Sequence, residues 1–232
     1  MKQIKFTFAA LTAVCWILCT STSAFAAFSG WATASLDYAS IELDLGSNVT
    51  SSISYYAFAQ YGDQTDTSSS ASEALIEIDT DNWAWAEADT ADSYEDIYAG
   101  VSVDNPATAT ISNAIAEYGI SFTAAEAGTL AISIDYDLEI GASSTAYAEA
   151  LAYLTINGET YDSAGIDFYA YNDMSKELSD LGTLTYSYSY TAGEEVTILL
   201  GADAYASAVP VPGAGLLLST GLIVLAAIRR KS

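Results

Sequence analysis

Apolar and polar residues alternate along several stretches of this chain, and this period of two limits the fold more than any other feature of the sequence. Every second residue from Leu130 to Ile140 is apolar, while the residues between them include Asp135, Asp137 and Glu139. Successive side chains of a β-strand point to opposite faces, so the apolar set lies on one face of a half-buried strand. Shorter stretches repeat the pattern at residues 41–45, 76–79, 184–190 and 196–200. The sequence therefore predicts an all-β domain of antiparallel sheets, each packed on one face.

Turn residues separate these stretches. Asn157-Gly158 lies between two strand-like stretches, and Asn-Gly suits a type I′ turn because both central residues need a positive φ. The composition of the preceding residues, 146–154, is ambiguous, since alanine, glutamate and leucine favour a helix while alanine at every second position fits a strand. Because these residues lead directly into the hairpin, we predict a strand there. Further turns are expected at residues 46–48, 127–128 and 192–193.

Residues 27–208 are numerous enough for one or two β domains. Asn105-Pro106 is the only internal proline signal and marks a candidate junction. The residues before it contain few long apolar strands, however, so one antiparallel β-sandwich, jelly-roll-like and built from both halves, is the more economical prediction. Residues 64–72 are polar and of low complexity, which predicts a long exposed loop.

The C-terminal residues, 209–232, carry three signals in a fixed order. An extended proline-containing motif comes first, formed by Val209, Pro210, Val211 and Pro212. Residues 213–228 follow without a charge, and as a helix they would span about 24 Å, slightly less than the hydrocarbon core of a bilayer. A basic cluster closes the chain, formed by Arg229, Arg230 and Lys231. We expect a transmembrane helix at residues 213–228 with its basic end on the cytoplasmic side.

This order of proline motif, short apolar helix and basic cluster resembles the PEP-CTERM sorting domain, which exosortases recognise in Gram-negative bacteria. The resemblance covers about a tenth of the chain. Pro210 and Pro212 match the two prolines of the family motif, while Val211 stands where that motif has glutamate, as in its VPLPA-type branch. The resemblance implies processing by an exosortase, transient anchoring in the inner membrane and delivery to the cell surface or extracellular matrix. An ordinary C-terminal membrane anchor is the alternative.

The N-terminal residues, 1–26, predict a Sec signal peptide, which makes the Sec translocon an expected partner. Lys2 and Lys5 form a positive region, and the apolar residues 6–18 follow. The small-residue cleavage pattern consists of Ala24, Ala26 and Ala27, with cleavage before the last of them. An uncleaved membrane helix is the alternative, but so short an apolar stretch is poorly suited to spanning a bilayer.

The exported residues, 27–208, are strongly acidic. They hold all 30 acidic residues of the chain and a single basic one, Lys176, which gives a net charge of −29. Nucleic acid is excluded as a partner because no basic patch is present to contact phosphates. Such a charge attracts divalent cations, and adaptation to a saline medium explains it equally well.

The composition also limits the chemistry. The chain has no histidine, and both cysteines, Cys15 and Cys19, lie within the predicted signal peptide. Catalytic triads, imidazole proton transfer, histidine-based zinc sites and disulfides are therefore unavailable to the exported part. Carboxylate chemistry remains the one enzymatic option.

An acidic stretch at residues 79–96 is a candidate Ca²⁺ site. Its closely spaced carboxylates supply the oxygen ligands that Ca²⁺ needs, although the glycine and distal glutamate of an EF-hand loop are missing. The candidate ligands are Asp79, Asp81, Glu87 and Asp89. A solvated acidic face is the alternative, and Ca²⁺ is the only cofactor that the sequence suggests.

Two aromatic pairs are candidate ligand-binding residues, because exposed aromatic faces allow ligands to stack on them. They are Trp83 with Trp85 and Tyr186 with Tyr188. Core packing is the alternative for both pairs. The carboxylates of Asp135, Asp137 and Glu139 share a strand face at separations that glycosidases use, but accidental pairs are expected among so many acids.

Together these features predict a protein without catalytic residues that acts at the cell surface or in the extracellular matrix. Its expected role is a structural or glycan-binding one in an exopolysaccharide or biofilm matrix, as the resemblance of the tail implies. The alternative is an extracellular polysaccharide hydrolase or lyase that works through carboxylates.

Overall fold

The computed structural model describes residues 29–43, 50–70, 73–78, 84–89, 96–104, 110–143, 145–170 and 174–208. All of them belong to one compact unit, Phe28–Val209. The predicted signal peptide and sorting tail lie outside the described residues, as do Asp79, Asp81 and Trp83. None of the described residues forms a helix with the length and hydropathy needed to cross a bilayer.

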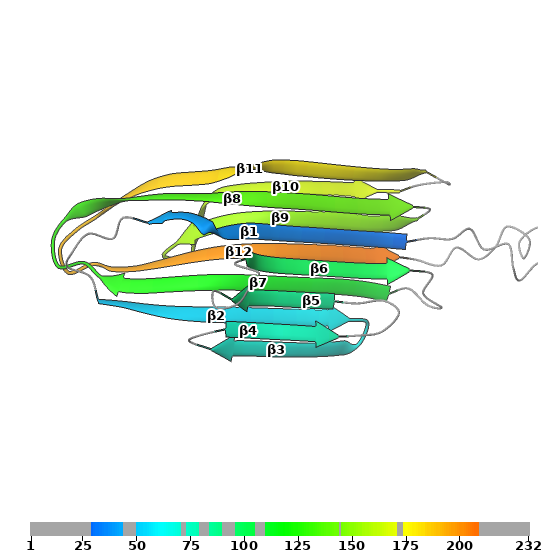
Figure 1. The fold of residues 1–232 in the computed structure, drawn as a ribbon, viewed down its shortest axis with the longest axis horizontal. Coiled ribbons are helices and arrows are strands. Elements are labelled where there is room, and N and C mark those ends of the chain that lie inside the picture. Colours follow the sequence, from blue (N-terminus) through cyan, green and yellow to red (C-terminus); the bar gives the residue numbers. More distant parts are fainter. Residues whose placement is uncertain are drawn as a thin grey trace, which may run out of the picture. The chain divides into compact units, whose positions relative to one another are not determined.

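The described residues form antiparallel β-strands arranged in two six-stranded sheets, which confirms the all-β prediction (Figure 1). Sheet A has the strand order β11-β8-β1-β6-β5-β4, and sheet B has the order β10-β9-β12-β7-β2-β3. The strands are β1 (Ser29–Leu43), β2 (Thr50–Tyr61), β3 (Gln64–Ser70), β4 (Glu73–Ile78), β5 (Ala84–Asp89), β6 (Asp96–Asp104), β7 (Thr110–Thr123), β8 (Gly128–Ser143), β9 (Ala146–Ile156), β10 (Glu159–Tyr169), β11 (Ser175–Tyr190) and β12 (Glu195–Ala208).

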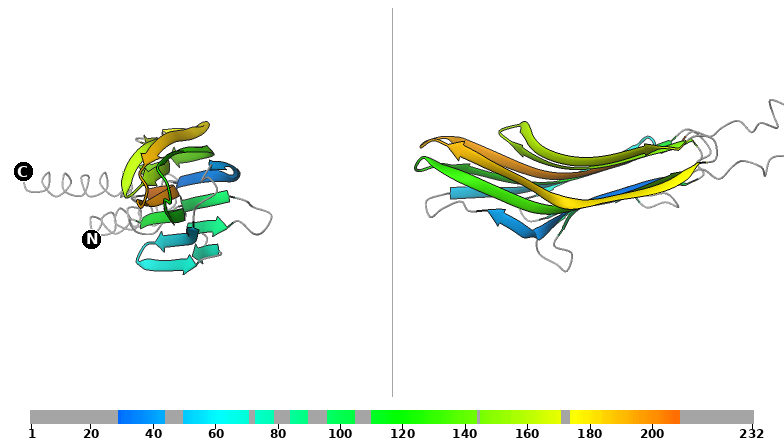
Figure 2. Two further views of the ribbon diagram at one scale, coloured as in Figure 1. Left: turned by 90° about the vertical axis from the view of Figure 1, so that its left-hand side faces the viewer. Right: turned by 90° about the horizontal axis from the view of Figure 1, so that it is seen from above.

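The two sheets pack face to face around one hydrophobic core, as a sandwich does. β1 and β6 of sheet A contact β12 of sheet B, and β8 contacts β9. The long strands curve along their length, as Figure 2 shows. Strands from before and after Asn105-Pro106 contribute to both sheets, so the two halves of the chain share one core.

Strand β8 follows the alternation that the sequence predicts. Leu130, Ile132, Ile134, Leu138 and Ile140 are buried, and the acidic residues between them are exposed on the outer face of sheet A. Tyr136 departs from the pattern because it is only partly buried: its ring lies against Gly182 near the edge, where its hydroxyl donates to Asp180 Oδ2 at 3.1 Å.

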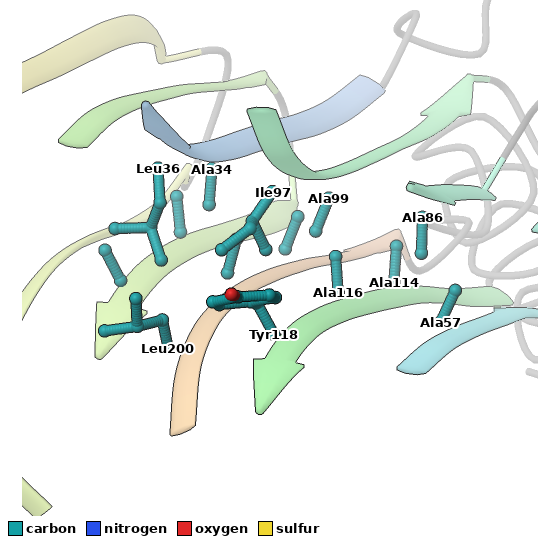
Figure 3. Close-up of a cluster of buried hydrophobic side chains, with 14 of the residues drawn as sticks. Ala34, Leu36, Ala57, Ala86, Ile97, Ala99, Ala114, Ala116, Tyr118 and Leu200 are labelled. Atoms are coloured by element: carbon teal, nitrogen blue, oxygen red, sulfur yellow. The ribbon is translucent and has the colours of Figure 1, made fainter. Parts of the chain in front are cut away.

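Alanine covers half of the inner face of sheet B. Four strands align their alanines in rows, one formed by Ala150, Ala204, Ala114 and Ala59, and the next by Ala152, Ala202, Ala116 and Ala57. The row that follows changes abruptly to Leu154, Leu200, Tyr118 and Tyr55. Figure 3 shows this change, with Ala114 and Ala116 on one side and Tyr118 with Leu200 on the other.

The alanine rows let the two sheets approach closely. A Cβ added at Gly30 of β1 would lie 3.1 Å from the backbone oxygen of Tyr147 and 3.3 Å from Ala146 Cβ, both in the opposite sheet. Large side chains have no room between backbones that are so near. The bulky rows at the other half of the core therefore provide most of the apolar area that stabilises the fold.

The predicted Asn157-Gly158 hairpin and the strand predicted at residues 146–154 are both confirmed. Asn157 and Gly158 have φ of 52° and 81°, as a type I′ turn requires, and they join β9 to β10. Residues 146–154 lie within strand β9, because their alternate alanines match the alanine row of β12. Tertiary pairing thus overrides the helix propensity of this stretch.

The prediction of a loop at residues 64–72 is wrong for most of this stretch. Gln64–Ser70 forms strand β3, which pairs with Tyr55–Tyr61 of β2 through a turn containing Gly62, whose φ is 57°. β3 is an edge strand that is exposed at every residue except the partly buried Ser68, so it needs no apolar residues. A polar edge strand and a polar loop have the same composition, which explains the error.

Candidate functional site

The outer face of sheet B carries a group of polar and aromatic side chains across β9, β12 and β7. Their register is fixed by the ladder, in which Gly201 lies between Tyr153 and Glu117, and Tyr205 lies between Glu149 and Asn113. Asp203 lies in the row between these two, flanked by Leu151 and Ile115. Because the alternate residues of these strands are the inward alanines and leucines, all of these side chains point outward.

The ring of Tyr153 lies flat over Gly201. A Cβ added at Gly201 would overlap atoms of this ring, so only glycine allows the ring to lie against the sheet. The phenol donates a hydrogen bond of 2.6 Å to Glu117 Oε1, which fixes the ring in this orientation. Burial, together with this bond to a carboxylate, raises the pKa of Tyr153, so the phenol stays a donor. Tyr153 remains partly exposed.

Beside this ring lies a pocket of about 120 Å³, lined by Asn113, Glu149, Leu151, Asp203 and Tyr205. Two of its oxygens, Asp203 Oδ1 and Asn113 Oδ1, are buried and make no hydrogen bond. Buried polar atoms are normally paired, because an unpaired one costs about 1–3 kcal/mol. The pocket thus holds two unused hydrogen-bond acceptors.

The pKa of Asp203 is raised to about 6. Burial is the largest cause, and the charges of Glu149 and Glu117 raise it further. At neutral pH the carboxylate is largely ionised in a site that disfavours its charge. A ligand that supplies positive charge or hydrogen-bond donors relieves this cost, and in the protonated form Asp203 can donate a proton.

Glu149 and Tyr205 form the rim of the pocket, and Tyr147 contacts both of them. Glu149 Oε2 accepts a hydrogen bond of 2.7 Å from the Tyr147 hydroxyl. The rings of Tyr147 and Tyr205 meet nearly edge to face, with centroids 5.8 Å apart. Burial and the bond to Glu149 raise the pKa of Tyr147. The rim thus combines aromatic edges with a carboxylate acceptor.

The outer face of sheet A carries a comparable ring that lies over a glycine. Trp31 of β1 lies over Gly141 of β8, where an added Cβ would overlap the indole. Asp135, Asp137 and Glu139 share this face and are exposed, and Asp135 accepts a hydrogen bond from Thr183 Oγ1.

The predicted aromatic pair of β11 lies at the edge where β11 and β10 meet. Tyr186 and Tyr188 pack partly buried against the core, and Tyr161 contacts both rings, with centroids 4.4 Å and 6.2 Å away. The register of β10 shifts next to Tyr161, at Asp162. The Thr185 amide of β11 donates a hydrogen bond of 2.9 Å to Asp162 Oδ2, and this bond connects the two sheets. These contacts join the two edge strands.

Three of the remaining predicted site residues lie in β5, and three are not described. Glu87, Asp89 and Trp85 belong to this strand, while Asp79, Asp81 and Trp83 lie outside the described residues. Among the described residues, no three acidic side chains form a group that could hold a metal ion. Whether the acidic stretch binds Ca²⁺ stays a prediction.

Sequence reasoning did not identify the pocket. Its residues come from three strands, and each is an outward position whose neighbours in the chain point inward. The alternate alanines at positions 146–152 and 202–208 were the available signal, because inward alanines imply that Glu149 and Asp203 point outward. Only the register of the ladder places these two carboxylates beside each other. No known protein family, curated protein or solved structure matches this chain.

Proposed function

We propose that this protein is an exported, non-catalytic component of the cell surface or extracellular matrix that binds a glycan on the outer face of sheet B. The observation that carries the proposal is the flat Tyr153 ring next to a pocket with two unpaired acceptors. A sugar ring has an apolar face that stacks on an aromatic ring, and hydroxyl groups that donate hydrogen bonds. Tyr153 offers the first contact, and Asp203 and Asn113 offer the second.

The two ends of the chain support the proposed location. A Sec signal peptide at residues 1–26 would export the chain, and the motif at residues 209–212 with the helix at 213–228 would hold it in the inner membrane until an exosortase processes it. The net charge of −29 would keep the exported domain soluble within a polymer matrix. Exopolysaccharide is then the proposed partner, and Ca²⁺ a proposed ligand of residues 79–89.

We further propose a jelly-roll-like fold. Four consecutive strands of each sheet, β11-β8-β1-β6 and β10-β9-β12-β7, have the order of an eight-stranded jelly roll in which β1 takes the place of the last strand. β2 with β3 and β4 with β5 would then be additions that widen the two sheets.

A matched pair of glycine substitutions tests the binding proposal. Gly201→Ala displaces the Tyr153 ring from sheet B, and Gly141→Ala displaces the Trp31 ring from sheet A in the same way. We expect the full chain, purified in detergent, to bind exopolysaccharide from the producing cells by isothermal titration calorimetry. Gly201→Ala should weaken this binding by about tenfold or more, and Gly141→Ala should leave it within about twofold. Equal affinity in all three proteins would contradict the proposed site.

The raised pKa of Asp203 favours one alternative function, a carboxylate-dependent polysaccharide hydrolase. Glu149 is the diagonal neighbour of Asp203 across the ladder, and such positions lie about 7–8 Å apart along the backbone, so the two carboxyl groups can reach the separations of glycosidase pairs. Incubation of the protein with the same polysaccharide distinguishes the two functions. Release of reducing ends by the natural protein and not by Asp203→Asn would establish hydrolysis, whereas binding without any release supports the non-catalytic role.

A further inference from the structure

We infer that the pocket at Asp203 binds the ammonium group of an amino sugar, so that the glycan is a polymer with free amino groups. The inference rests on the glycan-binding function proposed above and names the class of sugar. It follows from the hydrogen-bonding capacity of the pocket, from the charges around it and from its shape.

The pocket has an excess of hydrogen-bond acceptors. Asp203 Oδ1 and Asn113 Oδ1 are buried and unpaired, and Glu149 adds a carboxylate whose Oε2 receives one phenol. An ammonium group carries three donors and no acceptor, so it can pair with all three side chains. A neutral hydroxyl has a single donor and would leave at least one of the two buried oxygens unpaired, which costs free energy.

The charges around Asp203 are all negative. Glu149 faces it from β9 and Glu117 from β7, while burial and the bond to Glu117 raise the pKa of Tyr153 on β9, so that this phenol stays neutral. Asp167 of β10 lies next to Glu149 in the ladder. Sugars that carry carboxylate or sulfate groups would be repelled, and a bound cation would instead offset the repulsion among these carboxylates.

The shape of the pocket suits an organic cation. Leu151 and Tyr205 line it with apolar and aromatic surface, and the flat ring of Tyr153 lies over Gly201, in the row of the ladder next to Asp203. The volume of about 120 Å³ exceeds what a single metal ion occupies, and leaves room for the carbon atoms next to the amino group. An amino sugar can therefore place its ammonium at Asp203 while its ring stacks on Tyr153.

Cationic, neutral and anionic oligosaccharides test the inference, with the full chain kept in detergent. The probes are glucosamine oligosaccharides, their N-acetylated counterparts and oligogalacturonates of the same length, measured by isothermal titration calorimetry. We expect the glucosamine oligosaccharides to bind at least about tenfold more tightly than the N-acetylated ones, and the oligogalacturonates not to bind.

Two charge-matched variants separate the pocket from the general negative charge of the protein. Asp203→Asn and Asp137→Asn each remove one charge, but Asp137 lies exposed on the outer face of sheet A. Asp203→Asn should weaken glucosamine binding by at least about tenfold and Asp137→Asn by less than about twofold, also at about 0.5 M salt, where diffuse attraction is screened. Thermal melting verifies that Asp203→Asn is folded.

The possible failures differ from one another. Equal weakening by the two variants, or loss of all binding at high salt, would mean diffuse attraction and would overturn the inference. Tighter binding of the N-acetylated oligosaccharides or of the oligogalacturonates would overturn the inference and leave the proposed glycan-binding function standing. No binding of these probes or of the native exopolysaccharide would overturn both.

Discussion

At the scale of single residues, Asp203 combines a cost in folding stability with the proposed role in binding a cationic ligand. Its pKa of about 6 in the folded protein lies above the ordinary value of about 3.9 for an unfolded chain. The folded state therefore holds more protons between these two values, and stability falls as the pH rises through this window. Above pH 6 the buried charge costs roughly 2–3 kcal/mol.

The variant Asp203→Asn removes this pH dependence. We expect its free energy of unfolding to exceed that of the natural protein by about 2 kcal/mol near pH 7.5, with the difference disappearing below about pH 3, where the natural carboxyl is protonated in both states. Urea denaturation across this pH range measures the difference. A difference that stays constant with pH would mean that Asp203 is not perturbed in the folded protein. Asp137→Asn on the exposed face serves as the control.

At the scale of elements, the two faces of β8 respond differently to substitution. Ile134 is fully buried, so Ile134→Asp places an unpaired charge in the core, at a cost of several kcal/mol that is enough to unfold a domain of ordinary stability. Asp135 is exposed, and Asp135→Ser should change the melting temperature little. Similar melting of both variants would show that the faces have been assigned wrongly.

The alanine rows of sheet B predict that a larger side chain costs more stability on the inner face of β12 than on its outer face. Ala204 is fully buried in a row of four alanines, so Ala204→Leu inserts three carbon atoms between closely packed sheets. We expect a loss of about 3 kcal/mol or more, at the upper end of overpacking effects. Thr197→Leu on the exposed face of the same strand should cost less than about 0.5 kcal/mol. Denaturant titration compares the two, and an equal cost would mean that the sheets can separate easily.

The sequence alone predicts some of these strands and turns but not others. β8, the Asn157-Gly158 turn and β9 follow from local patterns, because alternation and turn chemistry are properties of neighbouring residues. β3 does not, since an edge strand with both faces in water has no apolar signal. The site could not be found in this way either. Tyr153, Gly201 and Glu117 are far apart in the chain, and only strand order and register bring them into one row.

At the scale of the whole molecule, the charge of −29 on residues 27–208 should make stability sensitive to cations. Screening at equal ionic strength affects Na⁺ and Ca²⁺ solutions almost alike, whereas a specific site saturates at micromolar to millimolar Ca²⁺. We expect a modest additional rise in melting temperature with Ca²⁺, which Asp79→Asn combined with Asp81→Asn diminishes. Equal melting temperatures in CaCl₂ and NaCl would leave screening as the whole effect.

A second prediction for the whole chain concerns the proposed processing of its two ends. If an exosortase reads the C-terminal motif, mass spectrometry of the released protein should recover no peptides from residues 1–26 or 216–228. Replacement of Pro210 and Pro212 with alanine should then keep the protein in the inner membrane, as fractionation of the cells would detect. Unchanged release of this variant would contradict sorting through the motif.

The central claim is that the outer face of sheet B binds a glycan, and methyl NMR of the leucine-labelled protein tests it most directly. Leu151 lines the pocket at Asp203, whereas Leu181 is 71% exposed on the outer face of sheet A. During titration with oligosaccharides from the exopolysaccharide of the producing cells, the methyl signals of Leu151 should shift and saturate while those of Leu181 stay unchanged. Shifts at Leu181 with none at Leu151, or no shifts at all, would contradict the account.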